Sequence, residues 1–150
     1  MIRVKLPTVG ICALLGASTL VGMAPASLAQ SSVLVAQATA ETFYTQALDK
    51  IRKGRYTEAI ADLNQAIALK ADYAAAYASR GYVRSVTGDQ AGAIADLDRA
   101  IELDPKNAVA YANRGSAHYA LGNAQAAMQD FDQAISLDAT YTPAYVNRAY

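Results

Sequence analysis

Two adjacent stretches of equal length decide the fold of this chain. Residues 74–107 read AAAYASRGYVRSVTGDQAGAIADLDRAIELDPKN, and residues 108–141 read AVAYANRGSAHYALGNAQAAMQDFDQAISLDATY. Laid over each other without a gap, they share the pairs Tyr77/Tyr111, Arg80/Arg114, Gly81/Gly115, Gly88/Gly122, Asp96/Asp130, Ala100/Ala134 and Leu103/Leu137. A fixed period of this length predicts a stacked repeat architecture rather than a single closed core.

The same frame continues on both sides of these stretches. In the preceding residues, Gly54 stands 34 positions before Gly88, and from Thr142 the pattern restarts and runs to Tyr150. We therefore expect three full repeats, at 40–73, 74–107 and 108–141, and a partial fourth at 142–150.

Each repeat contains two helical patterns separated by a turn. In the second repeat we expect helices over about 74–87 and 90–103. Gly88 lies where a left-handed residue ends a helix at low cost, and Asp89 can cap the next helix. Pro105 ends the second helix, because proline has no amide hydrogen and disfavours helix in the residue before it.

Small residues at fixed places predict how the helices pack. Gly81 and Gly115 would let the first helix of a repeat approach the second closely at Ala93 and Ala127. The small contacts toward the following repeat would be Ala66, Ala100 and Ala134. Larger apolar residues at helical spacing would fill the remaining space.

Charged residues recur at two places. The seventh place of repeats two to four holds Arg80, Arg114 and Arg148, and one place in the second helix of repeats one to three holds Asp62, Asp96 and Asp130. The first repeat has Gln46 instead of the arginine, so the arginine is missing where no repeat precedes it. This behaviour predicts ion pairs across the repeat junctions, namely Asp62–Arg80, Asp96–Arg114 and Asp130–Arg148.

The pattern resembles the tetratricopeptide repeat. The resemblance covers residues 40–150 and rests on the period, an aromatic at the fourth place, a small residue at the eighth, and the following Gly, Ala and Asp-Pro landmarks. Lys70-Ala71 and Ala139 depart from the Asp-Pro landmark. The resemblance implies an all-α fold, an α-solenoid in which antiparallel helix pairs form a right-handed superhelix.

The first 29 residues have the features of a secretory signal peptide. Arg3 and Lys5 form a basic start, residues 9–23 are mostly apolar and uncharged, and Ser27-Leu28-Ala29 offers small residues before a cleavage point at Gln30. We therefore expect export to the periplasm or another extracytoplasmic space. Retention of the segment as an uncleaved anchor is the alternative.

Cleavage would leave a chain of modest charge and no cysteine. Removing Arg3 and Lys5 lowers the basic residues from 13 to 11 against 13 acidic ones, a formal net charge of −2. That balance disfavours nucleic acid and acidic membrane surfaces as partners. Cys12, the single cysteine, lacks the usual context for lipid attachment. Residues 30–39 predict a flexible linker, in which Val33-Leu34-Val35 would be a strand or a sticky patch if it found a partner.

No residue pattern indicates catalysis, a metal or a cofactor. His118 is the single histidine and has no second histidine or cysteine with which to bind zinc. Gly81 and Gly115 fall inside predicted helices, so they do not form a phosphate-binding loop. We therefore expect a protein that is not an enzyme and needs no cofactor.

The resemblance implies a concave groove, lined by the first helix of each repeat, that holds an extended peptide or a partner helix. At the places usually exposed there, this chain has Tyr44, Leu48, Ser79, Tyr82, Ser85, Asn113, Ser116, Tyr119 and Asn147. Tyrosine offers a large contact area with a polar tip. Alternatively, several of these tyrosines only pack between neighbouring helices.

The predicted groove lacks the lysine-and-asparagine clamp that some family members use for acidic C-terminal tails. Tyr44, Leu48, Ser79 and Val109 replace the main members of that clamp. We expect a protein-interaction module or scaffold that binds a peptide or helix of another protein and does not insert into the membrane after cleavage. The alternative is an architectural repeat, or a fragment of a longer repeat protein, that associates through its open helical ends.

Three repeats are about the minimum for a stable stack, so one buried charge should unfold the whole repeat region. We predict that Val83→Asp or Leu97→Asp abolishes the cooperative unfolding transition seen by far-ultraviolet circular dichroism. Retention of a native-like helical signal and transition in both variants would contradict this expectation.

Overall fold

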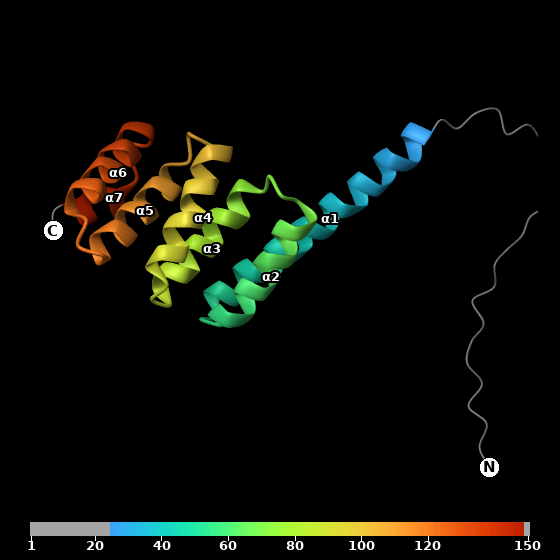
Figure 1. Cartoon of the computed structure of the whole chain (residues 1–150), viewed down its shortest axis with the longest axis horizontal. Helices are drawn as coiled ribbons and strands as arrows, with labels where there is room; N and C mark the ends of the chain where they lie inside the picture. Colours follow the sequence, from blue (N-terminus) through green and yellow to red (C-terminus); the bar gives the residue numbers. More distant parts are fainter. Residues whose placement is uncertain (1–24, 149–150) are drawn as a thin grey trace, which may run out of the picture.

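A computed structural model describes residues 25–148 as seven helices (Figure 1). The helices are α1 (Pro25–Arg52), α2 (Tyr56–Leu69), α3 (Ala74–Val86), α4 (Gln90–Leu103), α5 (Ala108–Ala120), α6 (Ala124–Leu137) and α7 (Thr142–Arg148). Consecutive helices pair as α1 with α2, α3 with α4 and α5 with α6, and the pairs stack side by side. The all-α repeat fold predicted from the 34-residue period is thus confirmed.

Each helix pair is joined by a turn that depends on one glycine. Gly54, Gly88 and Gly122 have φ values of 70°, 95° and 82°, in the left-handed region that glycine enters without steric cost. After Gly88, the Asp89 carboxylate accepts a hydrogen bond of 2.9 Å from the backbone N–H of Gly92 and caps α4. The predicted turn and cap are confirmed.

The apolar cores lie across the junctions between repeats. The three buried clusters include Ala47, Leu63, Ala66 and Ala76; Ala78, Ala93, Leu97, Ala100, Ala110 and Ala117; and Ala112, Ala134 and Ala144. Each cluster joins a helix pair to the first helix of the next repeat. Because no repeat completes a core by itself, neighbouring repeats stabilise each other.

Within each pair, a glycine sets the distance between the two helices. A Cβ atom added at Gly81 would lie 2.7 Å from Cγ of Leu97 and 3.1 Å from the carbonyl oxygen of Ala93. At Gly115 the corresponding neighbours are Phe131 at 2.7 Å and the Ala127 carbonyl at 3.1 Å. The close approach at Ala93 and Ala127 is therefore as predicted.

The arginine–aspartate pairs form within a repeat, so the predicted pairing across junctions is wrong. Nε and Nη2 of Arg80 donate to both carboxylate oxygens of Asp96, at 2.8 and 2.6 Å. Arg114 makes the same two bonds to Asp130, at 2.9 and 2.6 Å. In an antiparallel pair, the aspartate that lies opposite the arginine is the one 16 residues later, on the partner helix. The side chain of Arg148 lies outside the described residues.

The third guanidinium nitrogen does reach the preceding repeat. Nη1 of Arg80 donates to Asn64 at 2.7 Å, and Nη1 of Arg114 donates to Asp98 at 2.7 Å. Each arginine therefore links its own helix pair to the one before it. The contact involves the residue two positions after the repeated aspartate, not the aspartate itself.

The first repeat compensates its buried aspartate with a different residue. Nζ of Lys50 lies 2.6 Å from Oδ2 of Asp62. In the second repeat, Arg84 occupies the equivalent place. Its Nη1 atom lies 3.0 Å from Oδ2 of Asp96 and adds a second cation to the one from Arg80. Lys50 therefore supplies the counter-charge to Asp62, although the contact lacks hydrogen-bond geometry and the buried Oδ2 of Asp62 makes no hydrogen bond within the described residues.

The segment expected to be a flexible linker is helical. Helix α1 begins at Pro25 and runs without interruption through residues 30–39. From residue 26 to 52 the sequence contains neither glycine nor proline, and it is rich in alanine and other good helix formers. The predicted signal peptide lies mainly in residues 1–24, outside the described residues, and stays a prediction. No helix within residues 25–148 has the length and apolar character that a membrane span requires.

Gly81→Ala separates packing from helix propensity. Propensity alone predicts a gain of about 1 kcal/mol in stability. The short distances to Leu97 and Ala93 predict overpacking, with a loss of about 1–3 kcal/mol in the free energy of unfolding. Urea denaturation measures the sign, and a variant more stable than the wild type would contradict the packing argument.

The two ion pairs of Arg114, with Asp130 and with Asp98, should contribute different amounts to the free energy of unfolding. Arg114→Ala leaves the buried carboxylate of Asp130 without its main partner and should cost about 3 kcal/mol. Asp98→Ala removes only a half-exposed partner and should cost about 0–1 kcal/mol. Urea denaturation of both variants tests the difference, and equal losses would contradict it.

Candidate binding groove

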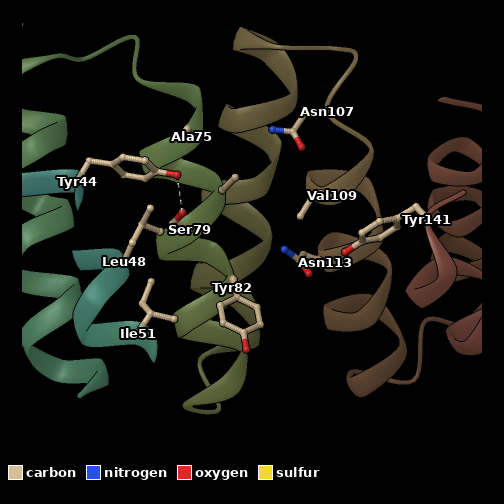
Figure 2. A pocket seen from close by; sticks show the side chains of 11 residues that line it. Tyr44, Leu48, Ile51, Ala75, Ser79, Tyr82, Asn107, Val109, Asn113 and Tyr141 are labelled. Atoms are coloured by element: carbon tan, nitrogen blue, oxygen red, sulfur yellow. Dashed lines mark hydrogen bonds between the residues drawn. The ribbon is translucent and has the colours of Figure 1, made fainter. Parts of the chain in front are cut away.

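A hollow of about 420 Å³ lies on the side of the stack formed by α1, α3 and α5 (Figure 2). It is lined by Tyr44, Leu48, Ile51, Ala75, Ala78, Ser79, Tyr82, Asn107, Val109, Asn113 and Tyr141. We call this hollow the groove. It has the size of a small ligand site but opens along three successive repeats, as an extended or helical segment would require.

Helical spacing brings these side chains to one side. Tyr44, Leu48 and Ile51 follow one another on α1 at intervals of four and three residues, so they share a face. Ser79 and Tyr82 share the corresponding face of α3 in the same way. The first helices of successive repeats therefore build one continuous surface.

Tyr44 is the aromatic residue in the wall of the groove at the first repeat, and Tyr73 packs against it. The rings of Tyr44 and Tyr73 lie 5.0 Å apart at an angle of 47°. The hydroxyl groups of Tyr44 and Ser79 are 3.5 Å apart and face each other across α1 and α3 (Figure 2). Burial, and to a lesser extent Tyr44, raises the pKa of Tyr73. The ring of Tyr73 thus packs against the ring of Tyr44 and stabilises its position.

Amide and hydroxyl groups form the wall at the second junction. Oδ1 of Asn107 accepts a hydrogen bond of 3.0 Å from the N–H of Ala110 and caps α5. Within the described residues, the side-chain amide of Asn113 has no hydrogen-bond partner, so it can both donate and accept. Burial, with a contribution from Asp138, raises the pKa of Tyr141. This wall can bond the backbone of a bound chain.

The groove is electrically neutral. None of its lining residues is charged. The basic residues of the neighbouring helices are engaged elsewhere, since Arg80 and Arg84 contact Asp96 and Arg114 contacts Asp130. Those contacts, chiefly the hydrogen bonds to the aspartates, raise the pKa values of Arg80 and Arg114. The groove therefore offers contact area and hydrogen bonds but no counter-charge.

The residues considered for chemistry do not assemble into a reactive site. His118 occupies the place held by Lys50 and Arg84 in the other repeats and does not line the groove. Its Nδ1 atom is buried and makes no hydrogen bond within the described residues. In residues 25–148, no three His, Cys, Asp or Glu side chains are grouped as a metal ion would require.

The groove brings together five of the nine predicted binding residues. These are Tyr44, Leu48, Ser79, Tyr82 and Asn113. Whether they bind a partner stays a prediction.

Of the other four predicted residues, Ser85, Ser116 and Tyr119 do not line the groove. Ser85 bonds with Gln90 at the end of α3, at 2.9 Å, and Ser116 donates to the carbonyl of Ala112, at 2.9 Å. Tyr119 is half exposed in the last turn of α5, beyond the groove. The side chain of Asn147 lies outside the described residues.

Two further lining residues, which the sequence pattern does not predict, precede the helices. Asn107 and Tyr141 line the groove, and both occupy the last place of a repeat, as does Tyr73. The available signal was a large polar residue directly before the first helix of each repeat. Such a residue extends the wall of the groove beyond the helix itself.

Comparison with protein families supports the repeat assignment. The family model described as "TPR repeat" matches residues 47–85 and 87–122. The model described as "Tetratricopeptide repeat" matches residues 108–141. A search of curated proteins finds no match.

Solved structures with the same fold include isolated domains of this kind. The second TPR of Spaghetti (RPAP3), bound to the HSP90 peptide SRMEEVD, is 27% identical with a TM-score of 0.70, covering 72% of this chain and 99% of that one. The Arabidopsis OM64 TPR domain is 24% identical with a TM-score of 0.74, and the match covers 76% of this chain and 94% of that one. A mutant of Thermobaculum terrenum O-GlcNAc transferase is 22% identical with a TM-score of 0.73, covering 75% of this chain but 22% of that one.

Proposed function

Because the chain belongs to the tetratricopeptide repeat family, we propose that it is a non-enzymatic interaction module that holds a peptide or helix of a partner protein. The observation that carries the proposal is the groove itself. It spans three repeats, presents aromatic and aliphatic surface, and keeps the Asn113 amide available for a bound backbone. Aromatic side chains of this kind dominate the energy of many protein interfaces.

The chemistry of the groove favours a partner segment with few or no acidic residues. The peptide SRMEEVD bound by the Spaghetti domain carries two glutamates and an aspartate. The groove of this chain has no basic lining residue to compensate such carboxylates. Moving an uncompensated carboxylate out of water is costly, so an apolar or neutral segment fits better.

We propose that this activity lies outside the cytoplasm. A basic start, an apolar stretch and small residues before Gln30 support export and cleavage. The exported chain would assist assembly of, or act as a scaffold for, another protein in the same compartment.

A second candidate function is architectural association through the end of the stack formed by α6 and α7. Met128, Leu137 and Tyr145 are exposed there by 46%, 36% and 41%. Such residues could cover each other when stacks meet end to end. The groove would then have no partner, and the size of the particle would depend on concentration.

Affinity capture tests the groove. The tagged full-length chain is produced in an exporting host and exposed to extract of the same compartment, beside a Tyr82→Ala/Asn113→Ala variant and a Tyr119→Ala variant. We expect a partner retained by wild type and by Tyr119→Ala but lost by the double variant. Tyr119→Ala is the matched control, because it removes an exposed tyrosine of α5 outside the groove.

Circular dichroism first establishes that all three proteins are folded. Capture of the same proteins by wild type and the double variant would contradict groove binding. A partner lost on Tyr119→Ala alone would move the binding surface toward the end of α5. Retention of only the chain itself by both variants would favour association through α6 and α7.

A further inference from the structure

The first part of α1 is an exposed arm with an apolar patch. Residues 25–39, which we call the arm, extend beyond the stacked repeats as a single helix (Figure 1). Val33, Leu34 and Val35 are exposed by 54%, 64% and 67%. Three large apolar side chains in a row, left exposed by the described part of the chain, indicate a contact surface.

The geometry of the patch requires an enclosing partner. Successive residues of a helix are separated by about 100°, so Val33, Leu34 and Val35 cover an arc of about 200°. A flat surface covers only one side of such a helix. A concave surface, such as the groove, contacts it over a wider arc.

The arm cannot reach the groove of its own chain. Val35 lies nine residues before Tyr44, the first residue of α1 that lines the groove, and therefore about 13 Å along the helix axis. Ala40 and Ala47 are fully buried and hold the intervening helix in the repeat stack. Bending the arm back would break this helix, so any groove that it occupies belongs to another molecule.

The arm and the groove match in charge. No charged residue or histidine occurs from residue 25 to 40, and all charged residues except Arg3 and Lys5 lie from Glu41 onward. The groove also has no charged lining residue. Placing one against the other therefore buries apolar surface without burying an unpaired charge.

We propose that the arm of one molecule docks in the groove of a second copy of the chain. The proposal rests on the proposed function, since it uses the groove as a binding surface. Because the two surfaces differ, the contact is head to tail, and it continues from molecule to molecule unless it closes into a ring. The docked arm also blocks the groove, so self-association and binding of another partner exclude each other.

Complementary variants test the contact. The full-length gene is expressed in an exporting host, and mass spectrometry reads the N-terminus of the purified chain. Sedimentation velocity then compares wild type with Leu34→Asp in the arm, Val109→Asp in the groove and Met128→Asp on α6. Met128 is as exposed as Val109, at 46% against 44%, and serves as the matched control.

We expect wild type and Met128→Asp to form larger species as concentration rises. Leu34→Asp and Val109→Asp should each weaken this association at least tenfold. Their mixture should form a 1:1 pair that grows no further, because one intact arm meets one intact groove. Tyr82→Asp replaces Val109→Asp if circular dichroism shows that the latter is unfolded.

Several results would overturn the proposal. These are a wild type that stays monomeric, association abolished by Met128→Asp but not by Leu34→Asp, a mixture that does not pair, or a purified chain that begins after Val35. Binding of monomers to neutral lipid vesicles through Leu34 would assign the arm to a membrane instead. A monomeric wild type whose captured partner is lost on Tyr82→Ala/Asn113→Ala would overturn the docking and leave the proposed function standing.

Discussion

The stack depends on a buried carboxylate in the second helix of each repeat. Asp62, Asp96 and Asp130 are almost inaccessible to solvent, and a charge in that position must be paired. The first helix of each pair supplies a cation, which is Lys50 in the first repeat and arginine in the next two. Because the arginine also reaches the preceding repeat, one guanidinium fixes both the helix pair and the junction.

This pairing also determines the character of the groove. The helices that line it, α1, α3 and α5, carry basic residues, but their lysine and arginine side chains contact aspartates. What remains on the concave side is Tyr, Ser, Asn and aliphatic surface. A family whose solved members include a complex with an acidic peptide thus appears here with a neutral groove. The selectivity for neutral segments that we propose would follow from where the cations are used.

The sequence predicts the repeat frame well, because Gly88, Asp89 and Pro105 act locally and recur every 34 residues. It fails where the answer depends on which residues face each other. The predicted arginine–aspartate pairs are wrong, since a shared period says nothing of the offset between antiparallel helices. Asn107 and Tyr141 were missed because they enter the groove from the turns. The arm lacks amphipathic periodicity, which predicts a linker, although no glycine or proline after Pro25 interrupts a helix.

The same neutrality connects the arm to the groove. An uncharged helix forms no ion pairs with a charged surface. Against a neutral groove it buries apolar area that would otherwise face water, which is favourable, so the arm and the groove are suited to each other. If every molecule carries both, the groove is filled whenever copies are abundant. The apparent affinity for another partner is then reduced in proportion to the fraction of grooves that remain free. A partner segment would have to bind the groove more tightly than the arm does. Its binding would release one molecule from the head-to-tail assembly. Binding and assembly are in this way one equilibrium, with the local concentration of the protein setting its position.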